Sequence, residues 1–120
     1  MQRFILFAVL FILATLAANA QEFVPLYPEG KMPNSKGMKL KEEIREERIY
    51  QVGTPGMHVF LPSAKDNTGV AVLVIPGGGY LRIAHIGART SVANWLNSLG
   101  IAVFALDYRL PTSPDLVQKE

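Results

Sequence analysis

Three consecutive glycines, Gly77 to Gly79, are the residues in this sequence whose type and spacing best suit a binding or catalytic site. They follow Pro76 and the apolar run from Val70 to Ile75. Glycine takes positive φ and lets a ligand approach the backbone without obstruction from a Cβ atom. A strand that runs into accessible backbone N–H groups is therefore a candidate anion site.

Two chemistries use such a site. The first is phosphate binding, but the loop has neither the G-x-G-x-x-G fingerprint opening into a helix nor the G-K-[ST] of the P-loop. The second is an oxyanion hole, in which two backbone N–H groups stabilise the charge that develops on a tetrahedral acyl intermediate. A tight strand-to-helix turn without any ligand remains open as a third interpretation.

The residues after the loop carry a resemblance to a known family. From Pro76 to Pro111 the chain reads PGGGYLRIAHIGARTSVANWLNSLGIAVFALDYRLP. It resembles the secreted esterase branch of the α/β-hydrolase superfamily, which contains acetyl xylan esterases and related carbohydrate esterases. The similarity includes the PGGGY turn, A-x-W-L in a helix, an apolar strand and YRLP, and it extends back to about Ile49. Where such enzymes often have Glu-Gly after the loop, this chain has Ile86-Gly87.

The resemblance implies hydrolysis of carboxylic esters on a polysaccharide or a small molecule, with acetyl or feruloyl groups on plant polysaccharide as the leading substrate class. It implies that the amides of Gly78 and Gly79 hold the oxyanion, and that Gly77, Tyr80 and His85 line the substrate site. It implies no metal and no organic cofactor. In the family all three triad residues come later than the matching region, so the nucleophile, acid and histidine are expected beyond Glu120.

No triad is expected among the residues of this chain itself. A nucleophilic serine in such a fold occurs in G-x-S-x-G, and none of the serines here has that context. His85 and Asp107 are therefore not interpreted as triad members, and Asp107 is expected to form a structural network with Arg109. His58 is expected to be a structural residue, because no second ligand is spaced to form a metal site with it.

The hydrophobic pattern predicts an α/β fold. Val70 to Ile75 is predicted to be a strand buried on both faces in the centre of a parallel sheet, and Ile101 to Leu106 a second strand parallel to it. Between them the pattern predicts a helix over Ala88 to Leu99 that ends at Gly100. Its core-facing stripe is predicted to be Val92, Trp95, Leu96 and Leu99, with Thr90 or Ser91 as the N-cap.

Earlier segments predict less regular structure. Ile49 to Val52 and Met57 to Leu61 are predicted to pair as antiparallel strands at the sheet edge, since a Gly-Thr-Pro-Gly turn separates them. Gln21 to Lys39 is rich in turn residues and is expected to be extended, with Phe23 and Tyr27 as anchors or polysaccharide contacts. Lys39 to Arg48 is expected to be a solvated connector or a short helical turn.

The N-terminus has the pattern of a signal peptide. Arg3 precedes an apolar stretch shorter than a spanning helix needs, and Ala18-Asn19-Ala20 has the small-x-small form of a cleavage site. Cleavage after Ala20 would give a secreted or periplasmic protein without a stable membrane anchor. The expected organisation is a signal peptide over 1–20, a charged extended segment over 21–48, and the N-terminal part of a truncated hydrolase domain over 49–120.

The charge and cysteine content of the chain limit the partners and the supports that the fold can have. The formal net charge is +2, and no basic block alternates with aromatic residues, so nucleic acid is an unexpected partner. The chain has no cysteine, so no disulfide supports the fold. The alternative function is a non-enzymatic exported protein, either a carbohydrate-binding module or an inactive truncated product. The sequence leaves the oligomeric state open.

Overall fold

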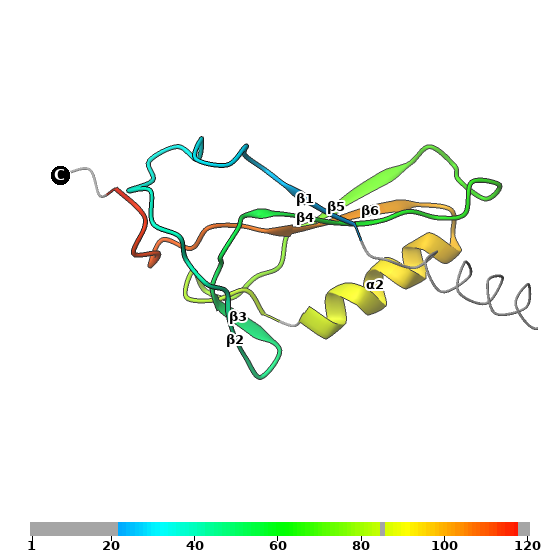
Figure 1. Ribbon diagram of the computed structural model, residues 1–120. Helices are drawn as coiled ribbons and strands as arrows, with labels where there is room; N and C mark the ends of the chain where they lie inside the picture. Colours follow the sequence, from blue (N-terminus) through cyan, green and yellow to red (C-terminus); the bar gives the residue numbers. More distant parts are fainter. Residues whose placement is uncertain (1–21, 85, 118–120) are drawn as a thin grey trace, which may run out of the picture.

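The computed structural model describes residues 22–84 and 86–117 (Figure 1). Within these residues the elements are β1 (Glu22–Pro25), β2 (Glu43–Arg45), β3 (Arg48–Gln51), β4 (Gly56–Phe60), β5 (Ala71–Val74), α2 (Ile86–Ser98) and β6 (Ala102–Asp107). The predicted signal peptide and His85 lie outside the described residues. No helix in the described part of the chain is long and apolar enough to span a membrane.

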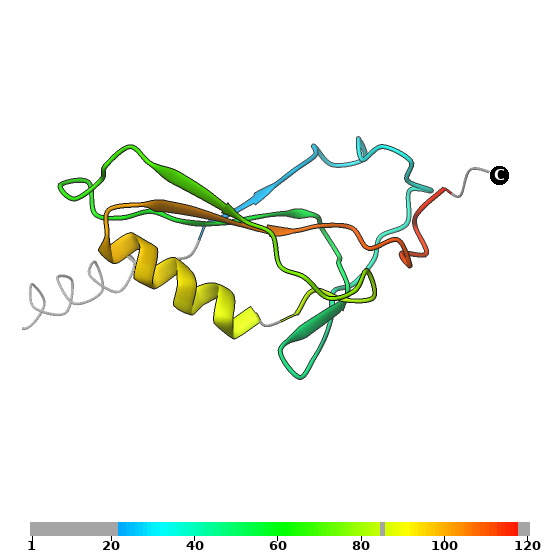
Figure 2. The same cartoon turned by 180° about the vertical axis from the view of Figure 1, so that it is seen from behind.

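The main layer is a four-stranded sheet in the order β1-β4-β6-β5. β6 runs antiparallel to β4 and parallel to β5, and α2 forms the connection between the two parallel strands. The helix lies along one face of the sheet, as the two opposite views show (Figures 1 and 2). The predicted strand-helix-strand unit is confirmed, and the mixed sheet with one helix is compatible with an incomplete α/β fold.

The prediction that β5 is central is wrong for the described residues. β5 has β6 on one side and no described strand on the other. Val70, Leu73 and Ile75 are 52%, 52% and 63% exposed, so the apolar run is not buried on both faces. The run reads as a fully covered strand because its residues are apolar, but β6 is its only described strand neighbour, and α2 packs on β6 and β4.

The predicted antiparallel pairing of Ile49–Val52 with Met57–Leu61 is also wrong. β3 pairs with β2 in a separate two-stranded sheet, whereas β4 pairs with β1 and β6. The segment predicted to be a connector or helical turn is thus half of a hairpin. Its turn residues Glu46 and Glu47 have φ values of 48° and 57°, which suit a two-residue hairpin turn.

The N-terminal segment forms a strand that the turn-rich sequence did not predict. β1 adds to the outer edge of β4, and Phe23 lies opposite His58 in that register. The Phe23 ring packs edge-on against the His58 ring with centroids 4.9 Å apart. Phe23 therefore anchors this segment through a packing contact, although its side chain remains 37% exposed.

Helix α2 turns a different face to the sheet from the one predicted. Trp95 is 62% exposed, and the buried residues are Arg89 and Ala93. The expected N-cap residues also lie inside the helix, where the Ser91 hydroxyl donates to the Gly87 carbonyl at 3.3 Å. The predicted end is confirmed: Gly100 has φ of 76°, and a side chain there would collide with the Asp66 carbonyl.

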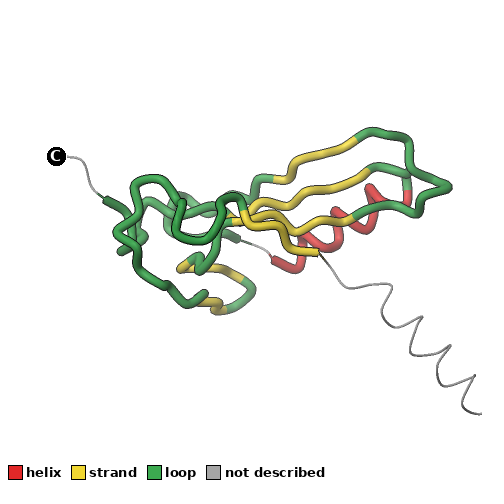
Figure 3. The backbone as a smooth tube through the Cα atoms, turned by 45° about the horizontal axis from the view of Figure 1, so that its top comes forward, coloured by secondary structure: helices red, strands yellow, loops and turns green. Residues whose placement is uncertain are grey.

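A small apolar core connects the hairpin to the loop that follows β5. Ile49 and Ile83 are each 1% exposed, and their backbones exchange two hydrogen bonds of 2.9 and 2.8 Å. Val52 and Leu110 complete this cluster. The tube view shows the hairpin beside the loops at one end of the sheet (Figure 3). This core therefore holds the far end of the glycine loop in place.

Candidate functional site

The glycine loop leaves β5 at the end of the strand, next to the first turn of α2 (Figure 1). Two backbone hydrogen bonds fold it on itself. The Ala84 amide donates to the Gly77 carbonyl at 2.9 Å, and the Leu81 amide donates to the Gly78 carbonyl at 3.3 Å. The loop is therefore a closed turn in which the carbonyl groups of Gly77 and Gly78 are engaged.

A side chain from β6's end fixes the start of the loop. The Tyr108 hydroxyl donates to the Pro76 carbonyl oxygen at 2.7 Å. In a trans peptide the C=O and the N–H of the next residue point in opposite directions. Because Tyr108 holds the Pro76 carbonyl, the Gly77 N–H must point away from Tyr108.

The loop needs glycine at two positions for different reasons. At Gly78 φ is 156°, and a Cβ atom would collide with the carbonyl oxygen of Arg82. At Gly79 φ is 64°, but a Cβ atom would meet nothing within 4 Å. Tyr80 shares this left-handed conformation with φ of 63°, and its side chain is 76% exposed. The Gly77 position is unrestricted, because a Cβ atom there also meets nothing.

The amides of Gly77, Gly78 and Gly79 donate no hydrogen bond to another described residue. Backbone N–H groups that lack a protein partner depend on water or a ligand. The loop therefore offers a short series of donors, which is the property that an oxyanion hole requires.

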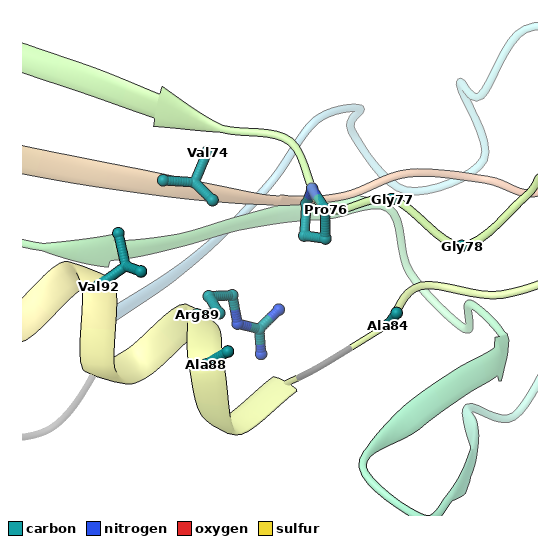
Figure 4. A pocket seen from close by; sticks show the side chains of 8 residues that line it. All are labelled: Val74, Pro76, Gly77, Gly78, Ala84, Ala88, Arg89 and Val92. Carbon is teal, nitrogen blue, oxygen red and sulfur yellow. The ribbon is translucent and has the colours of Figure 1, made fainter.

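A hollow of about 440 Å³ lies between the glycine loop and α2. Figure 4 shows the side chains that surround it. Its lining residues are Val74, Pro76, Gly77, Gly78, Ala84, Ala88, Arg89 and Val92. Of the predicted site residues, Gly77 and Gly78 line this hollow, while Gly79 and Tyr80 do not. His85 lies outside the described residues.

Arg89 reaches the same hollow from α2, and sequence reasoning missed it. Its Nη1 donates to Oδ1 of Asp107 at 2.5 Å, and both side chains are almost fully buried. His58 Nε2 lies 2.8 Å from Oδ2 of the same carboxylate. The three side chains form a buried network that connects α2, β4 and β6.

The expected pairing of Asp107 with Arg109 is wrong, whereas the structural role expected for His58 is confirmed. Arg109 instead donates to the carbonyl groups of Pro33 and Asn34, at 2.8 and 3.4 Å. The partners of Asp107 lie 18 and 49 residues away in the chain, so sequence spacing gave no signal for them.

Asp115 forms a second buried acidic site. It is fully buried, accepts a hydrogen bond from the Ser35 hydroxyl at 2.6 Å, and accepts another from the Met38 amide at 2.7 Å. The Ser35 bond, followed by the Met38 bond, lowers the pKa of Asp115 below its ordinary value, and these bonds outweigh the effect of burial. The site holds the N-terminal segment against the residues that follow β6.

The described serines do not form a nucleophile. Four of them donate to a carboxylate or a backbone carbonyl, and the Ser113 hydroxyl is buried without a partner. None is hydrogen-bonded to a described histidine. Among residues 22–84 and 86–117, no group of three or more metal-ligating side chains is assembled either.

Comparison with known proteins gives a partial match. A stretch of 59 residues, 49% of this chain, is 39% identical to an acetylxylan esterase of Xylanibacter ruminicola. The match covers 12% of that protein's length. No family model matches the chain, and no solved structure matches it. The similarity supports an esterase-like relationship at most.

Proposed function

We propose that this chain is the oxyanion-loop part of a serine-type carboxylic ester hydrolase that acts on acylated carbohydrate. The observation that carries the proposal is the run of amides from Gly77 to Gly79, none of which has a described hydrogen-bond partner; Gly77 and Gly78 also line the hollow. The partial similarity to an acetylxylan esterase supports the choice of an acylated polysaccharide as substrate.

In the proposed reaction a serine hydroxyl attacks the ester carbonyl carbon. The carbonyl oxygen becomes an oxyanion, and the amides of Gly78 and Gly79 stabilise it together with one amide beside that serine. The alcohol of the sugar leaves with the proton taken from serine, and water then releases the acid. No described serine is hydrogen-bonded to the described histidine, so the attacking serine is proposed to be a residue other than those in 22–84 and 86–117.

The decisive experiment examines the coding DNA beyond Glu120 and the protein that it encodes. A downstream G-x-S-x-G followed by an acid and a histidine, with release of acetate from acetylated xylan by that protein, supports the proposal. The matched control replaces the serine of that motif by alanine. A stop codon after Glu120 together with no acetate release would reject the enzymatic role.

Export is part of the same proposal, and it is tested separately. The signal-peptide pattern predicts a mature N-terminus at Gln21. It consists of Arg3, the apolar stretch that follows it and Ala18-Asn19-Ala20. Mass spectrometry of secreted or periplasmic material measures that terminus directly. A protein with Met1 retained in the membrane fraction would contradict the prediction.

One observation favours a second candidate, a non-enzymatic binding module. Tyr27 is 40% exposed on the segment after β1, and Tyr80 and Trp95 are more exposed still. Aromatic faces in water can pack against sugar rings through their apolar surface. Pull-down of the chain on insoluble xylan separates the two candidates, because retention that is lost in Tyr27→Ala without any turnover would favour binding alone.

A further inference from the structure

The guanidinium of Arg89 is buried with most of its hydrogen bonds unmade. The residue is 8% exposed, and its hydrogen bond to the described chain joins Nη1 to Asp107. The Nε atom is buried and has no partner among the described residues. A guanidinium has five N–H donors, and buried donors require acceptors. An acceptor from outside the described chain is therefore expected at this group.

The guanidinium faces the hollow beside the glycine loop. Figure 4 shows it between α2 and the loop segment that contains Pro76 and Gly77, with Ala84 on the other side. The guanidinium is the one polar side chain among the described lining residues, and the amides of the lining residues Gly77 and Gly78 have no described partner. No acidic side chain among the described residues lines the hollow. A ligand there must supply oxygen acceptors, and the guanidinium bonds most strongly to those of an anion.

The remaining lining selects among anions. Val74, Pro76, Ala84, Ala88 and Val92 are apolar and leave no further polar side chain to solvate a large polar ligand. The planar guanidinium fork matches a carboxylate or a phosphate. A phosphate has oxygens on every side and would place some of them against hydrocarbon, which is unfavourable without hydrogen bonds. A carboxylate with a short alkyl tail satisfies both parts of the lining.

We propose that this hollow is a binding site for a small aliphatic carboxylate, which Arg89 holds by its free N–H donors while the alkyl tail contacts Val74 and Val92. The origin of the ligand rests on the proposed function, because ester hydrolysis releases such an acid. Binding itself does not depend on turnover, so the two ideas can fail separately.

The test is a titration of the full 120-residue chain, labelled with ¹⁵N, with sodium butyrate at constant ionic strength. We expect saturable shifts of the Gly77 and Gly78 amide signals and of the Arg89 Nε–H signal. Butyramide has nearly the same shape without the charge and should give no saturable shift. Equal shifts with butyramide, or none with butyrate, would overturn the proposal. Binding of inorganic phosphate as tight as that of butyrate would overturn the proposed preference of the site for a carboxylate.

A matched pair of variants tests the location without disturbing the Arg89 network. Ala88 is exposed and lines the hollow. Ala88→Glu adds a negative charge to the wall and should weaken butyrate binding about tenfold or more, whereas Ala88→Gln, of the same size, should change it by less than about twofold. Equal weakening in both variants would mean that bulk alone matters and would overturn the electrostatic assignment.

Arg89→Lys tests the donor itself. Lysine keeps the charge but lacks the planar fork, so butyrate binding should weaken by about tenfold while the chain stays folded, as judged by its dispersed amide spectrum. Unchanged butyrate affinity in a folded Arg89→Lys chain would remove Arg89 from the site. A hydrolysis assay of the longer protein on acetylated xylan is run separately, so a failure of turnover leaves the binding result readable.

Discussion

The hydroxyl of Tyr108 and the carbonyl oxygen of Pro76 are joined by a hydrogen bond of 2.7 Å, across 32 residues of chain. This bond ties the end of β6 to the start of the glycine loop. It fixes the plane of the Pro76–Gly77 peptide and, with it, the direction of the first amide of the loop.

Tyr108→Phe removes this one hydroxyl and keeps the ring. We expect a loss of about 0.5–1.5 kcal/mol in the free energy of unfolding, because one partly buried hydrogen bond is lost. Faster hydrogen exchange at the Ala84 amide, which donates to the Gly77 carbonyl, should accompany it. Tyr80→Phe is the control, since its ring is 76% exposed. Identical exchange at the Ala84 amide in the two variants would show that Tyr108 does not order the loop.

The three glycines should respond differently to alanine. Gly78→Ala should be the most destabilising, because the new Cβ atom meets the Arg82 carbonyl oxygen. Gly79→Ala should cost about 1–2 kcal/mol from its positive φ alone. Gly77→Ala should leave stability nearly unchanged, since its Cβ atom has open space. Urea unfolding of the three variants gives the order, and a Gly77→Ala chain as unstable as Gly78→Ala would contradict it.

Asp115 should make the free energy of unfolding depend on pH in the acidic range. Its pKa is lowered in the folded chain, chiefly by the Ser35 hydroxyl, so the unfolded chain binds a proton at higher pH than the folded one. The stability that Asp115 contributes is fully present above its unfolded pKa, and it is lost as pH falls through the folded pKa. Thermal unfolding between pH 7 and pH 2 measures this loss. Asp115→Asn should flatten that part of the profile, while Asp66→Asn on the exposed surface should not.

Breaking the buried Arg89–Asp107 pair by removing either partner should be costly. Arg89→Met leaves a buried carboxylate with His58 as its remaining partner, and we expect a loss of about 3–5 kcal/mol. Arg89→Met combined with Asp107→Asn should lose less than the sum of the two single changes, because the uncompensated charge is gone. Additive losses in urea unfolding would mean that the two side chains are not coupled.

Local patterns predicted the strand-helix-strand unit because each part carries its signal within a few residues. The β5 run is continuously apolar, and Gly100 ends the helix at a position that requires positive φ. The hairpin of β2 and β3 was not predicted, because its turn is Glu46-Glu47 and lacks the glycine or asparagine that usually marks such a turn.

Long-range partners account for the other differences. The face of α2 that packs on the sheet carries a small residue, Ala93, and the charged Arg89. The pattern of large apolar residues therefore predicted the wrong face, the one that carries Trp95. Arg89 finds its acceptor on β6 and Asp107 finds His58 on β4, which only the sheet order brings together. In the candidate site the glycines were predictable from their type, but the cation that faces them was not.

The Asp115 site also has a consequence for how the chain is made. Met38 and Asp115 are separated by 77 residues, so the segment around Ser35 has no partner at this site until Asp115 has been synthesised. At about 5–20 residues per second this takes ~4–15 s. During that interval the segment around Ser35 lacks this contact and is accessible to proteases and chaperones. It can pack against Asp115 only after residues 115–117 have been synthesised.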